Sequence, residues 1–275
     1  MNSTNIKLID DLAQRHNYLS EEIKFLFGRN IWEYDIRQAN INALRALNRI
    51  DDNEYNLLSS IPKQLREVYI GKKILEDHSI QDSIYQGIYE AKFKFLKHNN
   101  IKLTEVLRIA NDAIYVISPI PKNKLVMYVN DFPITFVLKN QFTSYMSLYN
   151  NILFFFKNNI VDYNIDIKGI KDEKLYLHET FISFICKILE IYENAGKETA
   201  LQIFNQFYES YIKGELPVEY YREFNNDSGF RVKMNNLLEE TYIFNSPEGI
   251  PFSSIDTNYN LSILRLIYSY LLNAY

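Results

Sequence analysis

Six short β-rich runs in the middle of the chain restrict its fold more than any other feature of the sequence. They are separated by Asn, Asp, Pro and Lys, and they cover residues 105–117, 125–129, 134–138, 143–149, 153–156 and 163–167. Short runs bounded by turn-forming residues are typical of antiparallel hairpins. We therefore expect an antiparallel sheet in this part of the protein.

Helical patterns lie on both sides of this region. Ile41, Leu44 and Leu47 recur at three-residue spacing, which is typical of an amphipathic helix over 39–50. A strand is expected at 31–36, and a further helix is expected to begin at 20–22. The other expected helices cover residues 5–16, 63–77, 81–98, 175–194, 198–213, 217–224 and 261–272.

This order of segments predicts an α+β fold in which an antiparallel sheet packs against helices. We expect residues 1–170 to form an α+β region with inserted helices, and residues 171–275 to form a mainly helical C-terminal region. No linker-like composition separates the two regions. At 275 residues and 47% apolar composition, the chain has enough material for a substantial core, so we expect both regions to pack as one unit.

The cysteine content and the apolar runs indicate the compartment. Cys186 is the single cysteine, which excludes an internal disulfide and a cysteine-based zinc site. The N-terminal residues show no basic stretch followed by an apolar core. The most apolar run, 152–156, is far shorter than the roughly 20 residues of a membrane helix. We therefore expect a cytoplasmic protein that does not enter a membrane.

Several common classes of site are not supported by the sequence. Only eight glycines occur, and no phosphate-binding G-x-x-x-x-G-K-[ST] or G-x-G-x-x-G string is found. The four histidines show no metalloprotease spacing, and no G-x-S-x-G string is present. The net charge of −4 argues against a uniformly basic surface, although a local basic groove remains compatible with it.

Two aspartates occupy positions that suggest a catalytic metal site. Asp35 stands at the end of the first expected strand, directly before a helix, and Asp112 stands between two apolar halves of an expected hairpin. Two-metal phosphoryl transfer needs carboxylates from neighbouring strands that hold Mg²⁺ ions about 3.5–4 Å apart. Each aspartate also has a structural explanation, because Asp35 could cap the following helix and Asp112 could be a turn residue.

Both strings resemble motifs of the DNA polymerase palm. The segment Tyr34–Ile41 resembles motif A of family A enzymes, D-[YF]-S-Q-I-E-L-R, through Asp35, Gln38 and Ile41. The segment 112–116, Asp-Ala-Ile-Tyr-Val, is similar to the end of the family B motif C, D-T-D-S-I-[YF]-V. Asn111 and Ala113 depart from that motif, and its first aspartate falls at Ala110.

The resemblance implies a palm-like sheet and a set of roles. Asp35 and Asp112 would be catalytic ligands of Mg²⁺, with the backbone carbonyl of Ile36 as a third ligand. Asn40 stands where the family has its sugar-discriminating glutamate. Arg66 and Lys73, seven apart on an expected helix, would bind the phosphates of a nucleoside triphosphate.

A short string further along the chain extends the resemblance. Asp166-Ile-Lys-Gly-Ile170 resembles the segment after the palm in family B enzymes, and this implies that Lys168 contacts the primer. The resemblance then covers about residues 31–170. The abundance of Tyr, Phe, Asn, Ile and Lys, all with A/T-rich codons, and the style of the motifs suggest a bacterial virus or its host.

Three functions remain open at this point. The first is a polymerase-like nucleotidyltransferase that extends a primer–template with Mg²⁺. The second is a non-catalytic palm-derived module that binds nucleic acid or a replication protein, which the missing motif C acid favours. The third is a metal-dependent nuclease, in which Asp112, Asp166 and Lys168 outline a D…D-x-K site.

Overall fold

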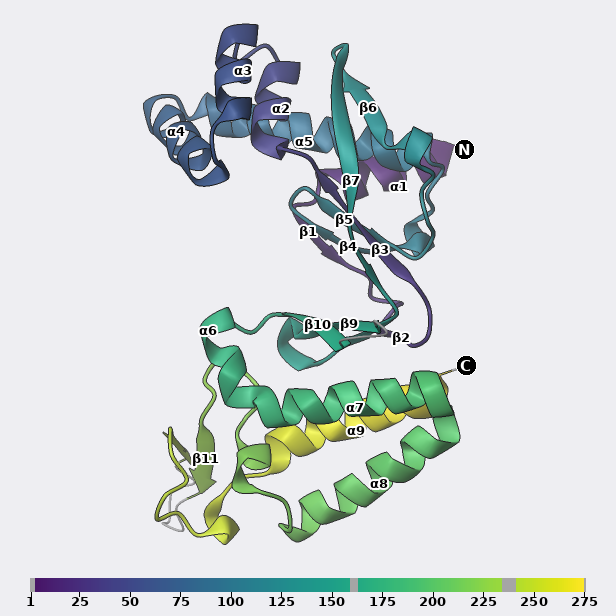
Figure 1. Ribbon diagram of the computed structural model, residues 1–275, viewed down its shortest axis with the longest axis vertical. Helices are drawn as coiled ribbons and strands as arrows, with labels where there is room; N and C mark the ends of the chain where they lie inside the picture. Colours follow the sequence, from purple (N-terminus) through teal and green to yellow (C-terminus); the bar gives the residue numbers. More distant parts are fainter. Residues whose placement is uncertain (1–2, 159–162, 234–240, 275) are drawn as a thin grey trace. The chain divides into compact units, whose positions relative to one another are not determined.

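The computed structural model describes residues 3–158, 163–233 and 241–274 (Figure 1). Its helices and antiparallel strands confirm the expected α+β class. The chain divides into two compact units. The N-terminal unit comprises Met1–Ile23 and Asn30–Gln141, and the C-terminal unit comprises Lys24–Arg29 and Phe142–Tyr275.

The N-terminal unit is built on a six-stranded sheet with the order β1-β4-β5-β3-β7-β6. Its strands are β1 (Asn17–Leu19), β3 (Ile31–Ile36), β4 (Val106–Ala110), β5 (Ala113–Val116), β6 (Val126–Val129) and β7 (Phe132–Phe142). Strand β5 pairs antiparallel with β4 on one side and with β3 on the other. Strands β3 and β4 therefore run in the same direction with β5 between them.

The connection from β3 to β4 consists of helices. These are α2 (Ala39–Ala46), α3 (Asp52–Ser60), α4 (Lys63–Glu76) and α5 (Ser79–His98). A strand, a helical crossover and a returning hairpin form a split β-α-β arrangement. This topology brings the C-terminal end of β3 and the β4–β5 turn to the same end of the sheet.

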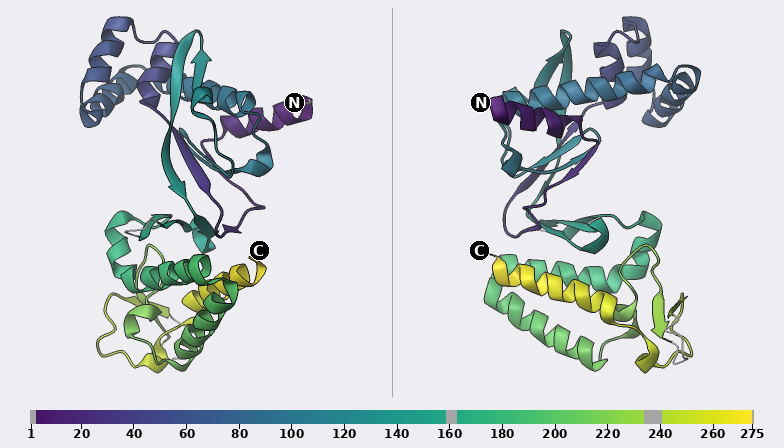
Figure 2. Two further views of the ribbon diagram at one scale, coloured as in Figure 1. Left: turned by 45° about the vertical axis from the view of Figure 1, so that its right-hand side comes forward. Right: turned by 180° about the vertical axis from the view of Figure 1, so that it is seen from behind.

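Helices α1 (Ser3–Gln14) and α5 lie side by side against one face of this sheet (Figure 2). Tyr34 and Ile114 from the sheet are buried in the same apolar cluster as Phe95 of α5. The rings of Tyr34 and Phe95 lie 5.7 Å apart, a distance typical of packed aromatic pairs. Burial of this face fixes the register of β3, so that Asp35 is directed away from the core.

A close approach between α2 and α5 holds the helical crossover together. Gly87 of α5 faces Ala43 of α2, and a Cβ atom at Gly87 would lie only 2.6 Å from that of Ala43. Ile41 and Leu44 of α2 pack with Ile84 of α5 in a separate buried cluster. The absence of a side chain at Gly87 therefore lets the two helices meet.

The C-terminal unit combines a small sheet with helices. The sheet order is β10-β9-β8-β2, and a separate hairpin pairs β11 with β12. The strands are β2 (Phe25–Leu26), β8 (Ser144–Ser147), β9 (Leu153–Asn158), β10 (Tyr163–Lys168), β11 (Phe230–Lys233) and β12 (Thr241–Phe244). The helices are α6 (Asp172–Leu175), α7 (Glu179–Ala195), α8 (Lys197–Lys213) and α9 (Asn258–Asn273).

The boundary between the units differs from the expected division at residue 170. Phe154 and Phe156 of β9 are fully buried in one cluster with Phe181 and Phe184 of α7. Strand β8 also pairs with β2, which lies in sequence between β1 and β3 of the N-terminal sheet. Strands β8 to β10 therefore belong with the C-terminal helices, and the expected single sheet is divided between two units.

Most expected elements lie within a few residues of their positions, but three differ, and the structure also contains elements that were not expected. Residues 20–22 form no helix, because the chain bends there before β2. The helix from Ala39 ends at Ala46, after which Asn48 adopts a left-handed φ of 56°. Helix α3 was not expected, although the Asp51 side chain caps it by accepting from the Glu54 N–H. Residues 217–224 contain only the short 3-10 turn Val218–Tyr221.

Further 3-10 turns occur at Leu103–Glu105, Lys122–Lys124, Tyr149–Asn151, Tyr176–His178 and Phe252–Ser254. Among the residues that the structure describes, no helix combines the length and the apolar composition that crossing a bilayer requires.

Candidate functional site

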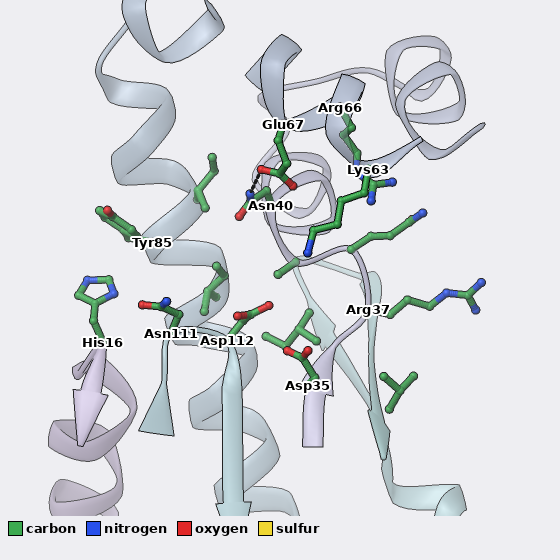
Figure 3. Close-up of a pocket in the computed structure, with 16 residues that line it drawn as sticks. His16, Asp35, Arg37, Asn40, Lys63, Arg66, Glu67, Tyr85, Asn111 and Asp112 are labelled. Carbon is green, nitrogen blue, oxygen red and sulfur yellow. Dashed lines mark hydrogen bonds between the residues drawn. The ribbon is translucent and has the colours of Figure 1, made fainter. Parts of the chain in front are cut away.

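A cavity of about 700 Å³ opens in the N-terminal unit where β3 ends. Figure 3 shows its lining residues, which come from the residue before β1, the end of β3, the β4–β5 turn, strand β7 and helices α2, α4 and α5. The residues with polar side chains are His16, Asp35, Arg37, Gln38, Asn40, Lys63, Arg66, Glu67, Tyr85, Asn111 and Asp112. Both candidate catalytic aspartates therefore face the same space.

Asp35 is held by the backbone between β3 and α2. The chain turns at Gln38, which has left-handed φ and ψ angles of 50° and 47°. Two hydrogen bonds fix the approach to this turn, from the Arg37 N–H to the Thr135 carbonyl at 2.9 Å and from Asn42 Nδ2 to the Arg37 carbonyl at 2.5 Å. Asp35 lies inside the strand and does not cap α2, so the helix-cap explanation is wrong.

Asp112 is presented by the two-residue turn between β4 and β5. Asn111 precedes it with a left-handed φ of 53°, a conformation that asparagine tolerates better than most residues. The Asn111 N–H donates to the His16 carbonyl at 2.7 Å, which ties the turn to the residue before β1. Since Asp35 pairs with Ala113 in the sheet register, the two aspartates occupy neighbouring strands at one level.

The two carboxyl groups influence each other. Burial and then the negative charge of Asp35 raise the pKa of Asp112 from 3.8 to about 6. Asp35 Oδ1 is buried and accepts no hydrogen bond from any described residue. A carboxylate pair of this kind is relieved by a cation that binds between its members.

A buried lysine stands behind the turn. Lys92 of α5 is only 2% exposed, and its Nζ donates to the Arg15 carbonyl at 2.8 Å. Burial lowers the pKa of Lys92 to about 8, and the charge of Asp112 opposes this shift. Lys92 therefore stabilises the ionised form of Asp112 from inside the unit.

A second lysine lies beside Asp35. The Nζ of Lys139 on β7 donates to Asp35 Oδ2 at 3.1 Å and lies 3.5 Å from Glu33 Oε1. Burial alone would lower the pKa of Lys139, but its hydrogen bonds with Asp35 and Glu33 and their charges outweigh burial and raise it. Glu33 is 3% exposed and accepts from the Tyr115 hydroxyl at 2.9 Å and Asn140 Nδ2 at 2.6 Å.

Helix α4 supplies a cationic wall opposite the carboxylates. In Figure 3 the Lys63 side chain extends toward Asp35 and Asp112, and Arg66 lies one turn further along the helix. Arg66 is 8% exposed and makes a long hydrogen bond of 3.5 Å to the Leu58 carbonyl. Arg37 at the end of β3 adds a third cation to the lining.

The remaining walls carry neutral or paired groups. Asn40 Nδ2 donates to Glu67 Oε2 at 3.0 Å in the lining of the cavity (Figure 3). His16 and Tyr85 form an edge-to-face ring pair with centroids 4.4 Å apart. The cavity thus combines a carboxylate floor, a cationic wall and an aromatic wall, which together suit a ligand with an anionic end and a flat end.

The structure gathers five of the residues that the sequence singled out. Asp35, Ile36, Asn40, Arg66 and Asp112 all line the one cavity.

Lys73 does not line the cavity. It lies two turns from Arg66 on α4, where its Nζ forms an ion pair of 2.6 Å with Glu54 of α3. Lys168 is in the C-terminal unit on β10, where its ammonium pairs with Asp166 at 2.8 Å.

Sequence reasoning missed Lys63 and the ion pair around Lys139. Lys63 stands three residues before Arg66, so helical spacing would place both on one face, and that signal was available. Glu33 stands two residues before Asp35, on the same face of the strand. No local signal links either residue to Lys139, because the pairing depends on where β7 lies in the sheet.

The donor set suits Mg²⁺. Within residues 3–158, 163–233 and 241–274, no three His, Cys, Asp or Glu side chains gather so that they could hold a metal ion. Two carboxylates still fit Mg²⁺, which prefers hard oxygen ligands and commonly takes few from the protein and the rest from substrate phosphates and water. The unpaired buried Oδ1 of Asp35 and the raised pKa of Asp112 both favour a cation at this place.

The comparisons with known proteins give a family. No curated protein matches the chain. A family model described as the bacteriophage PBS1 gene 130 protein matches residues 8–272, which include nearly all of both units. The suggestion of a bacterial virus is thereby confirmed at the level of the family. The chain belongs to the bacteriophage PBS1 gene 130 protein family.

Proposed function

We propose that the N-terminal unit is a polymerase-like nucleotidyltransferase that adds nucleotides to a nucleic-acid primer. The observation that carries the proposal is the meeting of Asp35 and Asp112 on the floor of a cavity whose facing wall is cationic. The two strings that resemble polymerase motifs A and C come from distant parts of the sequence. Their convergence, in the order expected for a palm, supports a shared role.

The carboxylates and a backbone carbonyl would hold the metal. Asp35, Asp112 and the carbonyl of Ile36 are the residues proposed to bind Mg²⁺. When bound, Mg²⁺ neutralises the charge that develops on the attacking and leaving oxygens in phosphoryl transfer. The split β-α-β frame keeps Asp35 and Asp112 on rigid strand ends, which suits a reaction that depends on positioning.

The cations of α4 would bind the triphosphate. Arg66 is held in place by its burial and its contact with the Leu58 carbonyl, so its guanidinium is preorganised. Lys63 takes the role that the sequence analysis gave to Lys73, because Lys63 lines the cavity and Lys73 pairs with Glu54. The residues bring positive charge to a molecule whose net charge is −4.

A further substrate contact would come from the wall of the cavity. Asn40, fixed by Glu67, would contact the sugar of the incoming nucleotide. This role rests on the resemblance of the surrounding string to a polymerase motif. Lys168 lies in the other unit, and its contact with a primer rests on the resemblance alone.

A non-catalytic nucleic-acid-binding or replication-protein-binding module is the second candidate. It is favoured by Ala110, which replaces the first acid of motif C, and by Lys139, which already neutralises Asp35. Such a module would keep the cationic wall for phosphate binding without turnover.

Primer extension tests the proposal. Wild type is incubated with a labelled primer–template, a mixture of nucleoside triphosphates and Mg²⁺, beside Asp35→Asn and Asp112→Asn. Asp82→Asn is the matched control, since Asp82 is an exposed residue of α5 outside the cavity. We expect extension by wild type and the control only.

Other products would point to the alternatives. Binding of the primer–template without extension, unchanged in both site variants, would favour the binding module. Shortening of the primer that is lost on Lys168→Ala would favour the nuclease.

A further inference from the structure

The two carboxylate oxygens of Asp35 differ in their hydrogen bonding. Oδ2 accepts from the ammonium of Lys139 at 3.1 Å, whereas Oδ1 is buried and receives no hydrogen bond from a described residue. Oδ1 therefore lacks a positive partner, and a cation bound between Asp35 and Asp112 would neutralise it while Lys139 stays on Oδ2. A cation that shares Oδ2 has to displace the ammonium.

Neighbouring acidic residues hold the ammonium group of Lys139 in place. Its Nζ lies between Asp35 and Glu33, and Glu33 is itself fixed by Tyr115 and Asn140. Glu33 is almost fully buried, while the Lys139 side chain is 54% exposed. The ammonium is thus anchored from the inside of the sheet, but its long stem can swing toward water without disturbing the core.

We propose that Lys139 is an internal cation that fills one of the two cation positions of the Asp35–Asp112 pair in the free protein. The free protein then binds one divalent ion, and a second ion enters only when the ammonium moves away. This inference rests on the proposed metal site and assigns Lys139 as a positioning residue that acts through Asp35. A lysine serves this purpose because it is a compact point charge on a flexible chain.

The experiment counts bound Mn²⁺ by electron paramagnetic resonance, in the absence of nucleotide. Wild type is expected to bind one ion, and Lys139→Met is expected to bind one more ion than wild type. If the spectra do not resolve two separate ion sites, Lys139→Met should bind Mn²⁺ at least about tenfold more tightly than wild type. The reason is that the variant removes a unit positive charge in contact with the Asp35 carboxylate. Lys139→Arg keeps the charge and should behave as wild type.

Two further variants control for charge and folding. Lys122→Met removes a positive charge from an exposed residue outside the cavity and should leave Mn²⁺ binding unchanged. The double variant Glu33→Gln/Lys139→Met has the net charge of wild type and removes the buried Glu33 carboxylate that would otherwise lose its ammonium partner. It should bind the extra ion even if Lys139→Met alone folds poorly, and adding Asp35→Asn should abolish the gain.

Equal stoichiometry and affinity in wild type, Lys139→Met and the double variant would overturn the role of Lys139 but leave the proposed metal site standing. Two ions on wild type would also overturn it. If neither wild type nor any Lys139 variant binds Mn²⁺, the metal site fails and the inference fails with it.

Discussion

The carboxyl groups of Asp35 and Asp112 line one cavity and lie close enough for the charge of Asp35 to raise the pKa of Asp112, although four helices separate the two residues in sequence. Two like charges at such a distance destabilise the fold unless a proton or a cation lies between them. A protein that keeps two carboxyl groups so close together has an electrostatically unfavourable site at one end of its sheet. Such a site is characteristic of function, and it gives predictions for stability as well as activity.

Asp112→Asn should stabilise the N-terminal unit at pH 7. The raised pKa of Asp112 means that the folded state binds its proton more tightly than the unfolded state does. Stability from this proton is present below about pH 4 and is lost as the pH rises through about 6. We expect the variant to gain about 1–2 kcal/mol at pH 7 and little at pH 4.

Urea unfolding at the two pH values measures this difference. Trp32 is the single tryptophan and lies on β3 of the N-terminal unit, so its fluorescence reports on the relevant unit. An Asn variant that is less stable than wild type at pH 7 would contradict the account.

Mg²⁺ should stabilise wild type more at pH 7.5 than at pH 5, since a protonated Asp112 cannot serve as a ligand. The midpoint of thermal unfolding, followed at Trp32 with and without Mg²⁺ at constant ionic strength, gives the effect. The Asp35→Asn/Asp112→Asn variant should show no shift at either pH. A shift of equal size in the double variant would place the ion elsewhere.

Arg66→Met and Lys63→Met should each raise the KM for nucleoside triphosphate by about tenfold or more, because each loses a charged contact with the phosphates. Lys73→Met is the matched control on the same helix. It loses only the exposed ion pair with Glu54, which is worth about 0–1 kcal/mol of stability, and should leave KM unchanged. If Lys73→Met raises the KM and Lys63→Met does not, Lys73 binds the triphosphate, as the sequence analysis expected.

Gly87→Ala should destabilise the helical crossover by about 1–3 kcal/mol, because the new methyl group meets Ala43 at 2.6 Å. Adding Ala43→Gly should recover part of this loss. Gly71→Ala on α4 is the control, since nothing lies within 4 Å of a Cβ there, and it should stabilise the helix by about 0.5–1 kcal/mol. Denaturant unfolding of the four proteins separates crowding from helix propensity.

The sequence predicted those parts of the site that are encoded locally. Asp35 ends an apolar strand and Asp112 occupies a hairpin turn, so a few neighbouring residues revealed each of them. Arg66 was found from its place on an expected helix, but helical spacing alone could not decide between Lys63 and Lys73. That choice depends on α3, whose Glu54 binds Lys73 and which the sequence reading had missed.

The features that escaped prediction depend on long-range pairing. Lys139 meets Asp35 only because β7 lies next to β3 in the sheet. The two-residue strand β2 joins β8 across the sequence, and so short a strand has no recognisable pattern. The division at residues 141 and 142 follows from this pairing and from the burial of Phe154 and Phe156 among the C-terminal helices.

Non-additivity of the two aspartates tests the central claim most directly. The rate of nucleotide incorporation is measured for wild type, Asp35→Asn, Asp112→Asn and the double variant under the same conditions. If both carboxylates hold the same Mg²⁺ site, each single change should cost at least about 100-fold, and the double variant should be no slower than the worse single variant. Independent losses that multiply in the double variant, or incorporation at the wild-type rate by either single variant, would contradict a shared catalytic site.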